Sequence, residues 1–141
     1  MTQITFLHGA RDRLQATAAW LAHAGAEHRP VLVYVPASER CEQLDRLLWT
    51  QSATGFAPHC RADEKLAAET PVILATGLDD PPHDGCLVNL SEEIPPGFSR
   101  FGQLIEIVSA EDGDRLAGRA RFRYYRERGY PLETRDISGG L

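Results

Sequence analysis

The sequence has few of the features that mark a nucleotide-dependent enzyme or a membrane protein. Only one of its 15 basic residues is a lysine, Lys65. No segment matches the phosphate-binding loop G-x-x-x-x-G-K-[ST] or the dinucleotide motif G-x-G-x-x-G. The nucleophile motif G-x-S-x-G is also absent, and no apolar run approaches the roughly 20 residues of a membrane span. These absences exclude a P-loop enzyme, and we expect no catalysis, no cofactor and no contact with a membrane.

Cysteines and targeting signals are also sparse. Three cysteines, an odd number, do not make a disulfide framework. The N-terminus shows no basic segment followed by an apolar one, so no signal peptide is readable. At 141 residues, with 43% apolar residues and a net charge of −5, we expect one cytoplasmic domain spanning residues 1–141, with 138–141 as a loose tail.

Short apolar segments alternate with amphipathic ones along the chain. We expect strands at residues 4–7, 31–35, 72–75, 87–90 and 104–108, and helices at 10–26, 38–50, 95–101 and 111–128. The last helix should end at Gly129, before an extended tail at 131–137. The alternation predicts a three-layer, Rossmann-like α/β domain with a mainly parallel sheet that lacks a phosphate-binding loop.

A metal or catalytic site is conceivable around His59, Cys60, His83 and Cys86. The spacing His83-x-x-Cys86 suits a metal, but His59 and Cys60 are adjacent and cannot easily reach one tetrahedral ion together. Turn residues and small buried thiols explain the same pattern, so we expect no metal. A degenerate α/β enzyme with its site here remains a minor alternative.

The last predicted helix carries a charge opposite to that of the chain. Residues 115–128 contain six arginines and one glutamate, a net +5, so the remainder carries −10. Arg115, Arg119, Arg123 and Arg126 are spaced i, i+4, i+8 and i+11, which places them on one stripe of a helix. Phe122 lies beside that stripe. Such a cationic and aromatic surface predicts an anionic ligand.

Two ligands suit this stripe. Single-stranded nucleic acid would place phosphates on the arginines and bases on the rings. An acidic peptide would place its terminal carboxylate on an arginine beside an apolar pocket. A long polyanion would be repelled by the acidic remainder, whereas a short peptide feels only the local field within about 8 to 10 Å. The charge distribution favours the peptide, and direct nucleic-acid binding stays as the alternative.

Three segments together resemble one protein family. They are Leu44-Asp45-x-x-Leu48-Trp49, Phe56-x-Pro58-His59 and Arg119-x-x-Phe122-Arg123-x-Tyr125-Arg126-x-x-Gly129-Tyr130. They are similar to the chi subunit of bacterial DNA polymerase III, along nearly the whole chain. The resemblance implies an accessory subunit of the clamp loader, without catalysis of its own, whose α/β domain lacks a phosphate loop.

The resemblance also implies partners and site residues. The family binds the psi subunit, which links it to the clamp loader, and the acidic, Phe-ending C-terminal tail of single-stranded DNA-binding protein, so that it meets DNA only indirectly. The residues that match positions of the tail site are Arg119, Phe122, Arg123, Val108 and Thr134, and more loosely Trp49 and Phe56. No motif in the sequence assigns the residues that face psi.

Overall fold

A computed structural model describes residues 1–26, 30–50, 59–61, 72–79, 81 and 84–140. The strands in these residues are β1 (Gln3–Ala10), β2 (Val31–Tyr34), β3 (His59–Arg61), β4 (Val72–Ala75), β5 (Cys86–Asn89), β6 (Gln103–Ser109) and β7 (Leu132–Asp136). The helices are α1 (Arg13–Ala26), α2 (Ser38–Thr50), the 3-10 helix η2 (Phe98–Arg100) and α3 (Asp112–Glu127).

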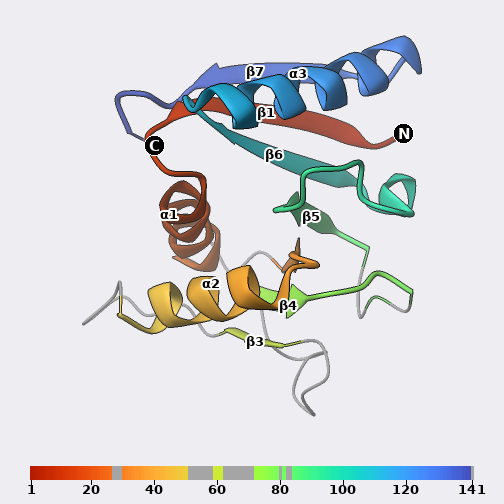
Figure 1. Cartoon of the computed structure of the whole chain (residues 1–141). Coiled ribbons are helices and arrows are strands. Elements are labelled where there is room, and N and C mark those ends of the chain that lie inside the picture. Colours follow the sequence, from red (N-terminus) through yellow and green to blue (C-terminus); the bar gives the residue numbers. More distant parts are fainter. Residues whose placement is uncertain (27–29, 51–58, 62–71, 80, 82–83, 141) are drawn as a thin grey trace.

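The seven strands form one sheet in the order β3-β4-β2-β5-β6-β1-β7 (Figure 1). Every neighbouring pair among them is parallel. Thr5 of β1 is in register with Ile105 of β6 on one side and Glu133 of β7 on the other. The predicted parallel, Rossmann-like α/β fold is therefore confirmed.

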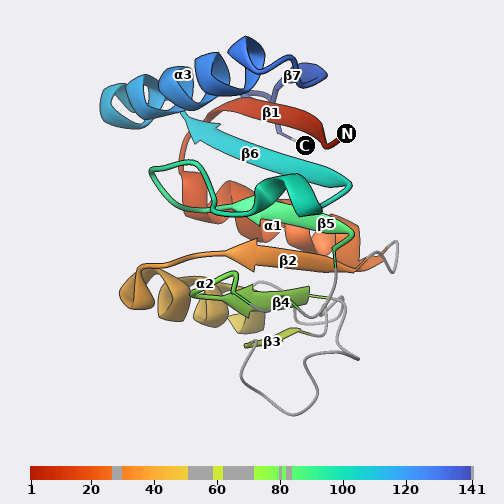
Figure 2. The same cartoon turned by 90° about the vertical axis from the view of Figure 1, so that its right-hand side faces the viewer.

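The helices cover opposite faces of the sheet, as the two views in Figures 1 and 2 show. In β2, successive side chains point to opposite faces. Val31 and Val33 belong to the core beneath α1 and α2, which includes Leu21 and Leu44. Leu32 belongs to the core on the other face, which includes Tyr125 of α3. The run 31–35 is apolar throughout because helices bury both of its faces.

Most predicted elements lie where expected, and the clearest differences concern the first strand, the first helix and the helix expected at 95–101. The first helix begins at Arg13 rather than at residue 10, because β1 continues to Ala10 and the side chain of Asp12 accepts a hydrogen bond from the Gln15 N–H at 2.9 Å. This is a helix N-cap. The helix expected at 95–101 is only the short η2. Gly129 ends α3 with φ of +78°, as predicted.

Two strands were missed at the sequence level, one at each edge of the sheet. The extended tail at 131–137 is in fact strand β7, which pairs with β1. Strand β3 pairs with β4 in a region where we expected no element. Edge strands are short or polar, so period-2 alternation of apolar residues does not reveal them. No helix among the described residues is long and apolar enough to cross a membrane.

Candidate binding pocket beneath helix α3

A pocket of about 270 Å³ lies between α3 and the edge of the sheet formed by β6, β1 and β7. Its walls come from four elements that are far apart in sequence. The residues that line it are Phe6, His8, Val108, Arg115, Gly118, Arg119, Phe122 and Thr134. Because β7 pairs with β1, the C-terminal segment closes one side of this pocket.

Four of the sequence-predicted site residues meet in this pocket. Arg119, Phe122, Val108 and Thr134 all line it, from α3, β6 and β7. Arg123 is exposed one turn further along α3 and is not among the lining residues.

The two loosely assigned aromatic residues fall wholly or partly outside the residues that the structure describes. Trp49 belongs to α2, whose buried residues pack on the opposite face of the sheet. Its side chain lies outside the described part of the structure, as does the whole of Phe56.

The pocket also contains residues that the sequence reasoning did not assign to it. Phe6 packs edge-on against Phe122, with ring centroids 5.2 Å apart, and His8 lies further along β1. Arg115 was recognised only as part of the cationic stripe, and Gly118 was not recognised at all. No local signal could place β1 here, because its pairing with β6 and β7 is a property of the sheet.

Gly118 sets how closely α3 approaches β6. A methyl group at this position would lie 2.9 Å from Cγ2 of Val108 and 3.0 Å from its Cγ1, closer than side chains tolerate. Glycine therefore lets the helix rest directly on Val108. The Val108 side chain consequently forms the floor of the pocket, with Phe122 beside it.

The polar groups at this pocket are mainly cationic. Arg115 and Arg119 are exposed at its rim, and none of the described residues that line it is acidic. Arg115 forms only an exposed ion pair with Asp112 at 3.8 Å, a kind of contact that contributes little. The guanidinium of Arg126 lies 5.9 Å from the centre of the Phe122 ring. An apolar floor with guanidiniums above it suits an apolar group attached to a carboxylate.

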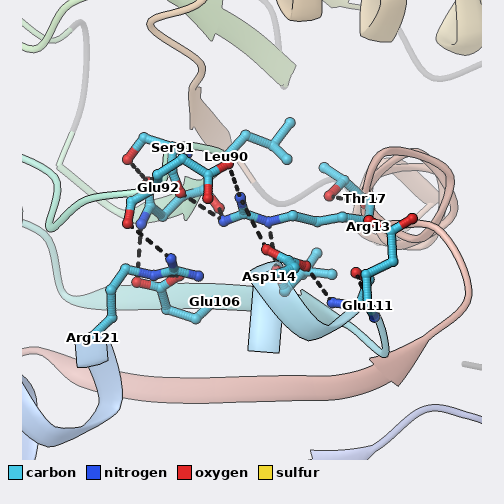
Figure 3. A network of polar contacts seen from close by, with 12 residues as sticks. Arg13, Thr17, Leu90, Ser91, Glu92, Glu106, Glu111, Asp114 and Arg121 are labelled. Atoms are coloured by element: carbon cyan, nitrogen blue, oxygen red, sulfur yellow. Dashed lines mark hydrogen bonds and ion pairs between the residues drawn. The ribbon is translucent and has the colours of Figure 1, made fainter. Parts of the chain in front are cut away.

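A buried polar cluster fixes α3 above this pocket. Arg121 is 2% exposed, and its Nε donates to Oε1 of the fully buried Glu106 at 3.0 Å. The Tyr125 hydroxyl donates to Oε2 of Glu106 at 2.6 Å, and Asn89 Nδ2 donates to the same oxygen at 3.0 Å. Burial, and then the negative charge of Glu106, raise the pKa of the Tyr125 hydroxyl. Two consecutive turns of α3 are thus tied to β6. Figure 3 shows the pair of Arg121 and Glu106.

The burial of Arg121 corrects the charge assigned to this helix. The net charge of +5 at residues 115–128 includes Arg121, but this residue faces the sheet and its charge is paired with that of Glu106. A signal was present in the sequence: Glu106 interrupts the apolar strand 104–108, and a carboxylate inside a buried strand requires a cationic or hydrogen-bonding partner. The stripe of Arg115, Arg119, Arg123 and Arg126 is exposed, as predicted.

A second buried arginine occupies the carboxyl edge of the sheet, close to Arg121 in Figure 3. Arg13 donates to three backbone carbonyls: that of Ile107 at 2.7 Å, of Asn89 at 3.1 Å and of Ser91 at 2.9 Å. Burial, and then the positive charge of Arg121, lower the pKa of Arg13. Arg13 therefore joins the ends of β5 and β6 to the start of α1.

The space beside Arg13 is where many α/β domains hold phosphate, at the carboxyl ends of parallel strands. A pocket of about 330 Å³ here is lined by two arginines and four carboxylates, those of Asp12, Glu92, Glu111 and Asp114. Arg13 already forms ion pairs with Glu92 at 3.7 Å and Asp114 at 3.8 Å. This excess of carboxylates would repel a phosphate, which agrees with the missing phosphate loop.

The residues considered for a metal are not gathered in one place. His59 and Cys60 belong to β3, whereas Cys86 opens β5. The strand order puts β4 and β2 between them, a separation of roughly 14 Å at about 4.8 Å per strand. His83 lies outside the described residues. Cys60 and Cys86 are therefore too far apart to share an ion.

Comparison with known proteins agrees with the fold and the motifs. The sequence model of the family described as DNA polymerase III chi subunit, HolC, matches residues 1–133. The chain is 37% identical over 127 residues to the DNA polymerase III subunit chi of Pseudomonas aeruginosa, covering 89% of this chain and 87% of that protein. It is 26% identical to the subunits of the same name from Haemophilus influenzae, covering 77% and 76%, and from Escherichia coli, covering 87% and 87%.

Proposed function

The chain belongs to the DNA polymerase III chi subunit family, a replication accessory subunit, and on this premise we propose that its α3 pocket binds the C-terminal tail of single-stranded DNA-binding protein. The terminal phenylalanine ring enters the pocket beside Val108 and Phe122. Arg119 and Arg115 bind its carboxylate. One observation carries this proposal: the pocket combines an apolar floor with two guanidiniums at its rim, and none of its described lining residues is acidic.

The size and charge of the pocket suit such a tail. A volume of about 270 Å³ lies just below the usual range of about 300 to 1,000 Å³ for small-molecule sites, so it fits one ring and its carboxylate rather than a large cofactor. An arginine can grip a carboxylate with two parallel hydrogen bonds. Arg123 and Arg126 continue the exposed stripe and attract the acidic residues that precede the phenylalanine.

The proposed role is recruitment without catalysis. The subunit holds the tail with one surface and, through psi, connects single-stranded DNA-binding protein to the clamp loader. The tail site itself reaches DNA only through that protein. Outside residues 115–128 the chain carries a net charge of −10, which confines the positive potential to the stripe. A short acidic segment is therefore favoured over a long polyanion.

Calorimetric titration with a tail peptide ending in Asp-Ile-Pro-Phe tests the site. Each charge-assisted hydrogen bond is worth roughly 1.5 to 3 kcal/mol, so Arg119→Ala should weaken binding on the order of tenfold or more. Removing the final phenylalanine should abolish measurable heat. Added salt should weaken the wild-type complex, because charge attraction is screened.

The matched control is Arg46→Ala. Arg46 is exposed on α2, on the opposite face of the sheet, and its loss changes the net charge by the same amount. We expect that variant to bind the peptide as the wild type does. Unchanged affinity in Arg119→Ala would show that the tail binds elsewhere. Equal binding of the peptide without its phenylalanine would show that the apolar pocket is not used.

A further inference from the structure

The C-terminal end of α3 borders another pocket, which the proposed tail site does not use. It has a volume of about 490 Å³ and lies between α3, η2 and the segment before η2. The residues that line it are Ile94, Pro95, Pro96, Gly97, Phe98, Ser99, Tyr124, Arg128 and Tyr130. Among the residues that the structure describes, none lines both this pocket and the tail pocket.

The aromatic rings in this pocket pack against one another. The buried ring of Phe98 lies 5.1 Å from the ring of Tyr130 and 6.5 Å from that of Tyr124, centre to centre. Tyr125, anchored through Glu106, packs on Phe98 at 5.2 Å. Tyr124 and Tyr130 are both partly exposed. A ligand would therefore meet a platform of rings that already pack together.

Arg128 extends this platform with a planar cation. Its guanidinium carbon lies 3.5 Å from the centre of the Tyr124 ring, and its Nη1 lies 3.4 Å from the Tyr124 carbonyl oxygen. One face of the guanidinium is stacked on the ring, and the side chain as a whole is exposed. Among the residues that the structure describes, no carboxylate forms an ion pair with Arg128. The other face of its guanidinium is available to a ligand.

A second guanidinium lies next to Gly97, one of the residues that line this pocket. Arg100 folds back over Gly97, so that a methyl group on Gly97 would lie 3.0 Å from Nη2 of Arg100. No acidic residue occurs among the described residues that line the pocket. The pocket at the carboxyl edge, with its four carboxylates, has the opposite character. The charge of the α3–η2 pocket therefore selects a ligand with negative charge, and its rings and guanidinium plane select a flat one.

We propose that the α3–η2 pocket is a contact site for a few nucleotides of single-stranded DNA. A base stacks on the exposed face of the Arg128 guanidinium and beside Tyr130, while the flanking phosphates lie near Arg128 and Arg100. Stacking on aromatic rings and on arginine planes is how proteins hold unpaired bases without reading sequence. An acidic peptide without an aromatic side chain would use the cations but would leave the rings of Phe98, Tyr124 and Tyr130 without a partner.

The contact is short and acts alongside the tail site. Arg128 directly follows the last residue of α3 and is six positions after Phe122, about 9 Å along the helix axis. When the tail pocket holds the tail of a DNA-bound protein, that DNA lies close to the α3–η2 pocket. The high local concentration of DNA then allows a weak site to be occupied. The acidic remainder of the chain restricts the contact to a few nucleotides, within the screening length of about 8 to 10 Å.

Fluorescence anisotropy with a short labelled oligothymidylate at low salt tests the proposal on the full chain, with no tail peptide present. Loss of one base-stacking partner should weaken binding by at least about fivefold, so we expect this loss for Arg128→Ala. Arg128→Lys keeps the charge but not the plane, and it should lose most of the same affinity. Arg119→Ala should bind the oligonucleotide as the wild type does, which separates this test from that of the tail site.

The control is Arg126→Ala, which removes the same charge two residues before Arg128 but on the side of Phe122. Equal weakening by Arg126→Ala and Arg128→Ala, or full binding by Arg128→Lys, would show general charge attraction and overturn the site. A proline-rich peptide is the other ligand that aromatic grooves accept. If such a peptide binds here and the oligonucleotide does not, the proposal is wrong.

Discussion

The buried ion pair between Arg121 and Glu106 gives the most demanding prediction about this molecule. Arg121→Met keeps a long flexible side chain but removes the cation that lies 3.0 Å from Oε1 of Glu106. At an effective dielectric constant of about 20, two charges at 3.0 Å attract by about 5.5 kcal/mol, and desolvation of both groups offsets much of this. Removing one partner leaves Glu106 buried without a countercharge. We expect Arg121→Met to lower the free energy of unfolding by about 3 to 5 kcal/mol.

A second substitution separates the effect of charge from the effect of packing. In Arg121→Met/Glu106→Gln the amide carries no charge and still offers an oxygen to the Tyr125 hydroxyl. The double variant should therefore be more stable than Arg121→Met alone, because the second substitution removes the unpaired buried charge. If Arg121→Met destabilised the protein only through lost packing of the arginine side chain, the double variant would be less stable than the single one.

Urea denaturation followed by circular dichroism measures these differences, with the transition slope checked for a constant value. The matched control is Arg123→Met, two residues along α3 and exposed, which should stay within about 0.5 kcal/mol of the wild type. A loss below about 1 kcal/mol for Arg121→Met would refute the reasoning, because it would mean that the buried pair contributes no more than a surface contact. A double variant less stable than the single one would refute it too.

Two further predictions follow from the same helix. Because folding raises the pKa of the Tyr125 hydroxyl, the stability that this group contributes is complete below about pH 10 and is lost as the pH rises further. In urea denaturation at alkaline pH, Tyr125→Phe should therefore reduce the fall of the unfolding free energy by up to about 1.4 kcal/mol per pH unit. Gly118→Ala should collide with Val108 and weaken tail-peptide binding, whereas Gly113→Ala, with open space around it, should leave binding unchanged and raise the melting temperature.

Local pattern predicted most of the secondary structure. The strands at 31–35, 72–75 and 104–108 were readable because both faces of a central parallel strand are buried, which makes the run apolar. The helix ending at Gly129 was readable from its periodicity and its glycine. The edge strands β3 and β7 were not, because their residues are polar and only pairing with β4 and β1 makes them strands.

The candidate site was only partly predictable. Arg119 and Phe122 were found from their spacing on one helix and from a family resemblance, and Val108 and Thr134 from the resemblance alone. Phe6 and His8 joined the pocket only when the sheet placed β1 between β6 and β7. Spacing along a helix says which residues share a face, but it does not say which strand lies beneath them.

The sequence by itself determined the class of fold, the absence of a phosphate loop and the stripe of Arg115, Arg119, Arg123 and Arg126, because each depends on residues that are close along the chain. Only the tertiary structure decided which cations are free to meet a ligand. Arg121 lies between Arg119 and Arg123 in sequence, yet it points into the sheet and is neutralised by Glu106. A charged side chain can be buried only where an opposite charge or hydrogen-bonding group meets it, and such a partner from another strand comes into contact only when the chain has folded.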